Sequence, residues 1–210
     1  MKIKVFLAIF LISMTLTVFS QEQKMSASEI ANFKATVVKD TKNIKSLKTD
    51  FVQYKHLDFL SKDIETSGKM AFKSPNSLNW QYTKPYQYSI IFKNNKVYIN
   101  DQGKKNTVDM GNSKMFEKIN KLIVGSVSGN LFDDKEFSIA YFKTKEFYIT
   151  KLSPKTAAIK KYIKQVDLYF PIQDATVSQV KLIEPSNDFT RIVFKNKIIN
   201  AKIDDSAFTN

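Results

Sequence analysis

The sequence predicts a mostly β protein (α+β) in which about eleven antiparallel strands form one strongly curved sheet. Apolar and polar residues alternate with a period of two through most of the chain after residue 45, and turn-forming residues separate the alternating runs. Helical periodicity occurs near the start and near the middle. So many strands in one domain must curl or split into layers. A curled sheet that is closed or nearly closed into a barrel, with helices on its concave side, is the economical arrangement.

The first helix is predicted to begin after Ser26. Ser26 and Glu29 have the spacing of a capping box, in which each side chain bonds the other residue's backbone N–H group. Ile30, Phe33 and Val37 fall on one face of the helix that follows.

A meander of strands follows this helix. Asn94-Asn95 is a tight-turn signal between two apolar runs, and Asp101 opens the next turn. The strands predicted in this half are 51–56, 64–73, 78–83, 87–92, 97–99 and 106–110.

An amphipathic helix is predicted to interrupt the sheet within residues 112–128. Met115, Ile119, Leu122 and Ile123 fall at helical spacing, and lysines occupy the opposite side. Strands are then predicted at 136–142, 146–152, 162–170, 176–183, 189–195 and 197–203, with a turn at Asn196 between the last two.

The N-terminus indicates export. A short positive segment, an apolar run from Val5 to Phe19 and a polar stretch after it are typical of a cleavable signal peptide over residues 1–20. Residues 21–210 are then expected to form a single exported domain. The chain has no cysteine, so this domain is expected to be stabilised by its core and to carry no lipid anchor on a cysteine of its own.

The formal net charge is +13, and it falls to +11 when Lys2 and Lys4 leave with the signal peptide (13 − 2 = 11). Arg191 is the only arginine. Export and the shortage of arginine argue against a nucleic-acid partner. Anionic membrane surfaces or acidic protein patches fit the charge. A solvated, lysine-coated exterior is the alternative explanation.

Few residues are available for chemistry, so an enzyme is not expected. His56 is the only histidine, and no nucleophile-elbow spacing accompanies it. With no cysteine and one histidine, a His/Cys metal site is excluded by composition. The five glycines form no phosphate-binding loop, and no cofactor is predicted.

Aromatic residues are plentiful, with nine Tyr, seventeen Phe and one Trp. Leu78, Trp80 and Tyr82 share one face of a strand, and Ile90 and Phe92 extend a similar face on the next. This face is either ordinary core or the wall of a cavity for an elongated apolar ligand, which a curled sheet can enclose.

Several segments resemble the periplasmic lipoprotein carrier family, LolA. The stretch "LKTDFVQY" and the stretch "SGKMAFKSPNSLNWQYTKPYQYSIIFKNNKVYIND" follow the family's pattern of strands and prolines, including Trp80. The closing "RIVFKNKIINAKIDDSAF" resembles the family's final strands, with Asn200 and Phe208 in the expected places. The resemblance covers about residues 47–208, and residues 112–170 match only in layout.

The resemblance implies an incomplete β-barrel covered by helices, with an apolar cavity that takes up the acyl chains of lipoproteins. By this match Leu78 and Trp80 line the cavity. The pattern adds Tyr82, Ile90 and Phe92, and the stripe of Met115, Ile119, Leu122 and Ile123 is expected to form a lid.

The resemblance also implies partners. The carrier receives acylated lipoproteins from an inner-membrane Lol-type ABC transporter and brings them to the outer membrane or an acceptor there, and a monomer is expected. Ser74 stands where the family has an arginine that latches the lid, so the latch is expected to be absent, weaker or relocated. Two alternatives stay open, namely a carrier of another acylated or lipid-linked ligand and an interaction module whose cavity is filled.

Overall fold

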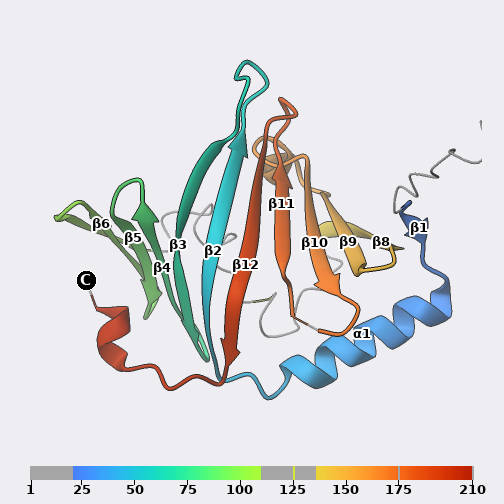
Figure 1. Ribbon diagram of the computed structural model, residues 1–210, viewed down its shortest axis with the longest axis horizontal. Helices are drawn as coiled ribbons and strands as arrows, with labels where there is room; N and C mark the ends of the chain where they lie inside the picture. Colours follow the sequence, from blue (N-terminus) through green and yellow to red (C-terminus); the bar gives the residue numbers. More distant parts are fainter. Residues whose placement is uncertain (1–20, 110–124, 126–135, 175, 210) are drawn as a thin grey trace, which may run out of the picture.

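The computed structural model describes residues 21–109, 125, 136–174 and 176–209. Within these residues, twelve strands form a single antiparallel sheet that curves strongly and stays open (Figure 1). The strands are β1 (Gln23–Lys24), β2 (Ser46–His56), β3 (Ile64–Lys73), β4 (Ser77–Lys84), β5 (Tyr88–Lys93), β6 (Lys96–Asp101), β7 (Lys104–Asp109), β8 (Phe137–Lys143), β9 (Phe147–Pro154), β10 (Gln165–Pro171), β11 (Gln179–Ile183) and β12 (Phe189–Ile199). The predicted fold class is confirmed, as an open sheet and not a closed barrel.

Two meanders lie side by side in this sheet. The strand order is β1-β8-β9-β10-β11-β12-β2-β3-β4-β5-β6-β7, so β2 to β7 form one meander and β8 to β12 the other. They join where β12 pairs with β2, from Phe189 opposite His56 to Ile199 opposite Leu47. Two strands of eleven residues each therefore hold the two halves together.

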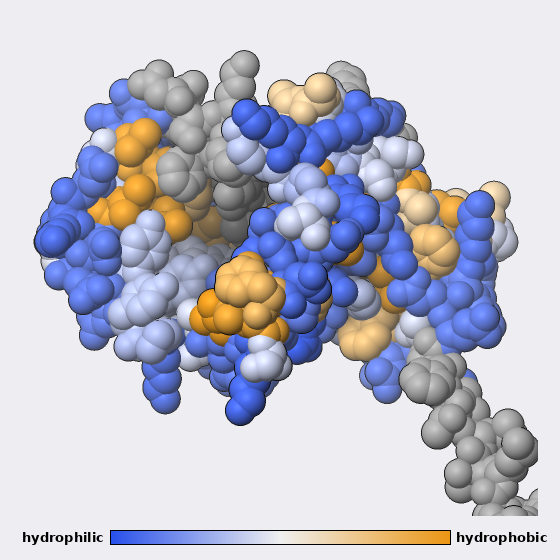
Figure 2. Space-filling view, turned by 90° about the horizontal axis from the view of Figure 1, so that it is seen from above, coloured by the Kyte–Doolittle hydropathy of each residue, from blue (hydrophilic) through white to orange (hydrophobic). Residues whose placement is uncertain are grey.

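Most of the core lies on one face of the sheet, which we call the inner face. Over β2 to β6, one apolar cluster includes Phe51, Leu78 and Trp80. Over β8 to β10, a second cluster includes Leu168 and receives side chains of the first helix. Phe194 of β12 packs against both clusters and connects them. Figure 2 shows hydrophobic residues along the wall of a hollow, with hydrophilic residues outside it.

The first helix, α1 (Ala27–Thr41), covers part of the inner face. Ser26 caps it, and the predicted capping box is present: the Ser26 N–H group donates to Glu29 Oε2 at 2.9 Å, and the Glu29 N–H group donates to Ser26 Oγ at 3.4 Å. Phe33 and Val37 are buried against β8 to β10. The amphipathic stripe read from the sequence therefore faces the sheet.

The C-terminal segment packs on the opposite, outer face. After β12, the chain leads to the short 3-10 helix η2 (Asp205–Phe208), which contacts β4 and β5. Ile203 and Phe208 bury Ile91 there, and the Asn79 side-chain amide donates to the Ala207 carbonyl at 2.7 Å. The outer face of this part of the sheet is thus covered.

Two parts of the predicted pattern differ from the structure, and a third is not tested by it. Strands 189–195 and 197–203 were expected as a pair, but β12 is continuous to Ile199, because Asn196 (φ 53°) forms an irregularity in the β12–β2 pairing instead of a turn. The short β1 and the helix α3 (Ala157–Lys160) carry too few residues for a periodic signal. The helix predicted within 112–128 lies outside the described residues, apart from the buried helical Gly125. In the described part of the chain, every helix is too short or too polar to span a bilayer.

Candidate functional site

The five described residues of the predicted cavity wall lie together on the inner face. Leu78 is opposite Phe92, and Trp80 is opposite Ile90, across the β4–β5 pair. Tyr82 continues the row towards the end of β4. Leu78, Trp80 and Phe92 are buried, whereas Tyr82 and Ile90 are only half-buried. The half-buried pair is therefore the part of this wall that a ligand can reach.

Trp80 is held by aromatic neighbours. Its ring stacks on that of Phe51 with the centroids 4.2 Å apart, and the Phe194 and Tyr82 rings meet it edge-on at 6.1 and 6.4 Å. The indole is 6 % exposed. Stacked and edge-on pairs of this kind fix ring orientation beyond what burial alone would do. The only tryptophan is thus a rigid part of the wall.

Gly68 makes this stacking possible. It lies in β3 between Phe51 of β2 and Tyr82 of β4. A Cβ atom at Gly68 would come within 1.9 Å of the Gln81 carbonyl oxygen and 2.7 Å of Phe51 Cζ. No side chain fits in that space, so glycine allows the Phe51 ring to lie over the sheet and meet Trp80.

A polar position lies at the edge of the apolar wall. The Tyr82 hydroxyl donates to Gln53 Oε1 at 2.9 Å. Burial raises the pKa of Tyr82 above its usual value, so the phenol is neutral over the physiological range. Its O–H group donates to Gln53, and its oxygen can accept a hydrogen bond at the margin of the wall.

The predicted lid residues, Met115, Ile119, Leu122 and Ile123, lie outside the described residues. Ser74 is described, and its backbone N–H group donates to the Lys45 carbonyl at 2.8 Å. His56 lies away from the cavity wall: its Nδ1 is 2.9 Å from Asp63 Oδ1, and its ring stacks on Phe189 at 4.6 Å. Among the described residues, no group of three or more His, Cys, Asp or Glu side chains could hold a metal ion.

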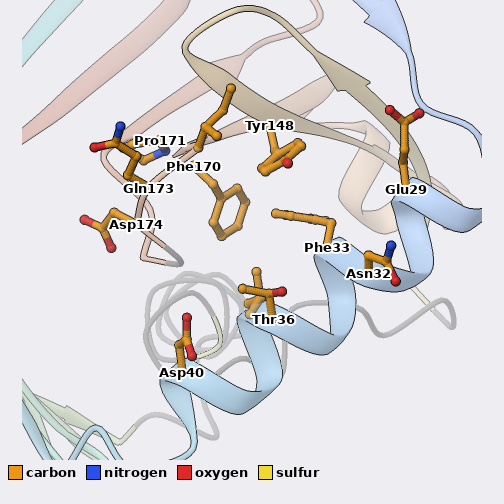
Figure 3. Close-up of a pocket in the computed structure, with 12 residues that line it drawn as sticks. Glu29, Asn32, Phe33, Thr36, Asp40, Tyr148, Phe170, Pro171, Gln173 and Asp174 are labelled. Atoms are coloured by element: carbon orange, nitrogen blue, oxygen red, sulfur yellow. The ribbon is translucent and has the colours of Figure 1, made fainter.

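A pocket of about 260 Å³ lies under α1, at the second apolar cluster (Figure 3). Its floor is aromatic, since the Phe33 ring centroid is 5.1 Å from both the Tyr148 and the Phe170 centroids. Figure 3 shows polar side chains of α1 and of the segment after β10 around this floor. The lining residues are Glu29, Asn32, Phe33, Thr36, Val37, Asp40, Tyr148, Phe170, Pro171, Ile172, Gln173 and Asp174.

Two carboxylates at the pocket rim are neutralised by lysines from the sheet. Lys143 bonds Glu29 and, with Ser26, lowers the pKa of Glu29 to about 2. Burial alone would raise the pKa of Asp174, but hydrogen bonds from Lys197 and Thr176 outweigh it and leave that pKa below its usual value. At these two positions the rim is therefore ionised and its charge is compensated, whereas Asp40 adds a third carboxylate to the lining.

None of the residues lining this pocket was among the predicted site residues. Phe33 and Val37 were expected only as the buried stripe of a helix. The pocket exists because β9 and β10 come to lie under that stripe. The residues that α1 contributes to the pocket and those that the other half contributes lie more than a hundred residues apart in the sequence. No local sequence pattern connects them.

Comparisons with known proteins agree with this architecture. A model of the family described as outer membrane lipoprotein carrier protein LolA matches residues 42–210. No curated protein matches the chain. Among solved structures, an uncharacterized conserved protein from Thermus thermophilus has a TM-score of 0.52 at 6% identity, covering 85% of this chain and 92% of that chain.

Two further solved structures have lower scores. A LolA superfamily protein from Nitrosomonas europaea has a TM-score of 0.44 at 8% identity, covering 84% of this chain and 97% of that chain. LprF from Mycobacterium bovis has a TM-score of 0.46 at 15% identity, covering 90% of this chain and 99% of that chain. At identities this low, only the structure with a TM-score above 0.5 is informative, and it supports a similarity of fold alone.

Proposed function

We propose that this chain, which belongs to the LolA family of outer membrane lipoprotein carrier proteins, is a periplasmic carrier that shields the acyl chains of lipoproteins on its inner face. The observation that carries the proposal is the apolar wall built by β4 and β5, where the half-buried Ile90 and Tyr82 flank the rigid Trp80. The pocket under α1 extends the apolar surface to the other half of the sheet.

An apolar surface of this kind can shield hydrocarbon from water. Each buried methylene contributes about 0.8 kcal/mol, so a long acyl chain in water is unfavourable by on the order of 10 kcal/mol. A preformed apolar wall recovers this free energy in proportion to the apolar area that the guest buries on it, without folding around the guest. Because the sheet is open, the guest can also leave without unfolding the carrier.

The remaining parts of the proposal come from the family and the N-terminal sequence. Export by the signal peptide would place the mature monomer in the periplasm. There it would receive acylated lipoproteins from an inner-membrane ABC transporter of the Lol type and deliver them to the outer membrane or an acceptor in it. Met115, Ile119, Leu122 and Ile123 would form the lid. No enzymatic step is proposed.

Titration of residues 21–210 with a fluorescent palmitoyl probe tests the proposal. We expect saturable binding with a shift in Trp80 emission. Ile90→Gln keeps the side-chain size but places an amide in the wall, so it should weaken binding at least about tenfold. Ile198→Gln is the matched control, because Ile198 is 57% exposed and pairs with Lys48 on the outer face.

Equal affinity of the two variants, or no binding of any acyl probe, would contradict the carrier. Mass spectrometry of the material that co-purifies from the periplasm then identifies the cargo. A lipoprotein acyl group supports the full proposal, whereas another acylated or lipid-linked molecule supports a carrier of different cargo.

A second candidate is an exported interaction module whose cavity is filled by its own side chains. Leu78 and Phe92 are 0% and 2% exposed, and the Trp80 indole is closely stacked. This candidate predicts that Trp80→Leu keeps the protein's function in cells and that neither form binds the palmitoyl probe.

A further inference from the structure

The connection between β2 and β3 carries the most exposed large apolar side chain of the described residues. Phe59 is 81% exposed, and Leu60 beside it is 36% exposed. Figure 1 shows that this hairpin projects beyond the other strands. Figure 2 looks onto this end and shows a compact hydrophobic patch that stands out from hydrophilic surface. We call residues 57–63 the hairpin tip.

The hairpin tip is held in place by the sheet. The Leu60 N–H group donates to the Leu57 carbonyl at 2.8 Å and closes a turn. The Asp58 N–H group donates to Asp188 Oδ1 at 2.9 Å in the neighbouring β11–β12 connection. At its base, His56 contacts Asp63 at 2.9 Å. Phe59 is therefore presented to solvent by a backbone that hydrogen bonds hold in place, so docking needs little further ordering of the backbone.

Lysines lie at the same end of the sheet. Gln165, Ile183, Phe189 and His56 form one row across β10, β11, β12 and β2. The connection that leads into Gln165 carries Lys160, Lys161 and Lys164, and it includes α3. The Lys164 N–H group donates to the Ile183 carbonyl at 2.8 Å, which fixes this connection beside the row.

Aromatic and acidic residues complete this end. Tyr162, next to Lys161, is 50% exposed, and the Lys161 Nζ atom is 5.7 Å from its ring centroid. Three of the carboxylates nearby have partners: Glu184 pairs with Lys55, Asp63 contacts His56, and Asp188 accepts from the Asp58 N–H group and the Ser186 hydroxyl. The hairpin tip itself adds one further carboxylate, Asp58, and one ammonium group, Lys62. The surface therefore presents apolar and aromatic side chains together with lysines.

We propose that this end of the sheet docks on an anionic phospholipid bilayer. Phe59 and Leu60 insert at the boundary between headgroups and acyl chains, while Lys160 and Lys161 lie among the lipid phosphates. Apolar area that can be buried in the interface and cations that attract anionic lipids are the two features that strengthen interfacial binding. Lysine stems also reach along apolar surface while the ammonium groups stay in water.

The size of the patch favours a bilayer over a protein partner. The exposed parts of two such side chains amount to on the order of 200 Å², whereas each partner of a stable protein interface buries about 600 Å² or more, half of a total of about 1,200 Å². A fluid bilayer accepts a small projecting tip without a complementary pocket. Docking there would also let an acyl guest pass between carrier and membrane without crossing water, and only this purpose rests on the proposed function.

Flotation with vesicles tests the docking. Residues 21–210 are mixed with vesicles of phosphatidylethanolamine and phosphatidylglycerol, or of phosphatidylcholine alone. We expect partition onto the anionic vesicles, reduced about tenfold or more in Phe59→Ser/Leu60→Ser and unchanged in Ile198→Ser. Ile198 is a comparably exposed side chain at the other end of β2. Lys160→Ser/Lys161→Ser should reduce partition onto the anionic vesicles only.

The single tryptophan allows a depth measurement. In the Trp80→Phe background, Phe59→Trp should shift its emission to the blue on anionic vesicles and be quenched by brominated lipids, while Ile198→Trp should not. Equal responses at the two positions, or equal partition of the tip and control variants, would overturn the proposal. So would absence of binding to every vesicle, which would leave the tip to a protein partner.

A separate measurement keeps the two proposals distinguishable. Phe59→Ser/Leu60→Ser should bind the palmitoyl probe in solution as the unaltered protein does, because the tip lies outside the apolar wall. Vesicle docking without acyl binding would reject the carrier and keep the docking surface. If the protein binds the acyl probe and its partition onto vesicles is the same with and without Phe59, the docking surface is rejected and the carrier is kept.

Discussion

At Gly68, the missing side chain is a packing requirement of the apolar wall. The glycine lies where the Phe51 ring crosses β3 to stack on Trp80. The requirement comes from neighbours on two other strands and not from backbone angles. At Gly103 glycine is favoured for the opposite reason: φ is +93°, a backbone angle that other residues rarely adopt, and a Cβ atom would meet no other atom within 4 Å.

Gly68→Ala should lower the free energy of unfolding by about 3 kcal/mol, the upper end of the usual cost of overpacking. Its Cβ must displace the β4 backbone or the Phe51 ring, so Trp80 emission should change as well. Gly103→Ala is the control. It should lower the free energy of unfolding by about 1 kcal/mol, because alanine is strained at the left-handed backbone angle of this position, and it should leave Trp80 emission unaltered. Chemical denaturation followed by fluorescence measures both. A Gly68→Ala protein with full stability and unaltered emission would contradict this packing.

At the scale of elements, the start of α1 is set by a local sequence signal and reinforced by a distant strand. Ser26 and Glu29 form the capping box, and Glu29 also pairs with Lys143 of β8. The sequence predicts the first interaction, because three residues separate the partners. It cannot predict the second, because 114 residues separate them.

The Glu29 carboxylate should make stability depend on pH in the acid range. Its pKa is about 2 in the folded protein, below the ordinary value of 4.5. Folding therefore favours the ionised form, and the contribution is complete above about pH 4.5 and lost as the pH falls towards 2. Denaturation of the unaltered protein and of Glu29→Gln should differ at pH 7 and converge at the acid end. A difference that is constant with pH would exclude this role.

At the scale of the whole molecule, the β12–β2 junction decides whether the two meanders behave as one body. Phe194 packs against both apolar clusters there, and its ring lies 6.1 Å from Trp80. A continuous inner face and a continuous pairing both cross the junction. From these contacts we propose that the expectation of one domain over residues 21–210 holds.

That expectation predicts one cooperative unfolding transition. Midpoints measured by Trp80 fluorescence and by far-UV circular dichroism should coincide. Phe194→Ala should lower the free energy of unfolding by about 2 kcal/mol, less than a fully buried phenylalanine, because the ring is half-buried. Phe142→Ala, an aromatic truncation on β8 outside both clusters, should lose less. Separate midpoints in the unaltered protein would show two independent units.

The sequence by itself determined the features that depend on near neighbours. Alternation placed most strands, the capping box located α1, and the shared face of Leu78, Trp80 and Tyr82 on one strand followed from its period of two. The β4–β5 pairing brought in Ile90 and Phe92 as expected, because a short turn joins those strands.

Only the tertiary structure decided which distant segments meet. It converted the predicted turn at Asn196 into an irregularity within β12, since pairing with β2 continues past it. It placed β9 and β10 under α1, which created the pocket floored by Phe33, and it left Phe59 at a projecting tip. Local patterns report the conformation of a segment, whereas a pocket or an exposed tip depends on what packs against that segment from elsewhere in the chain.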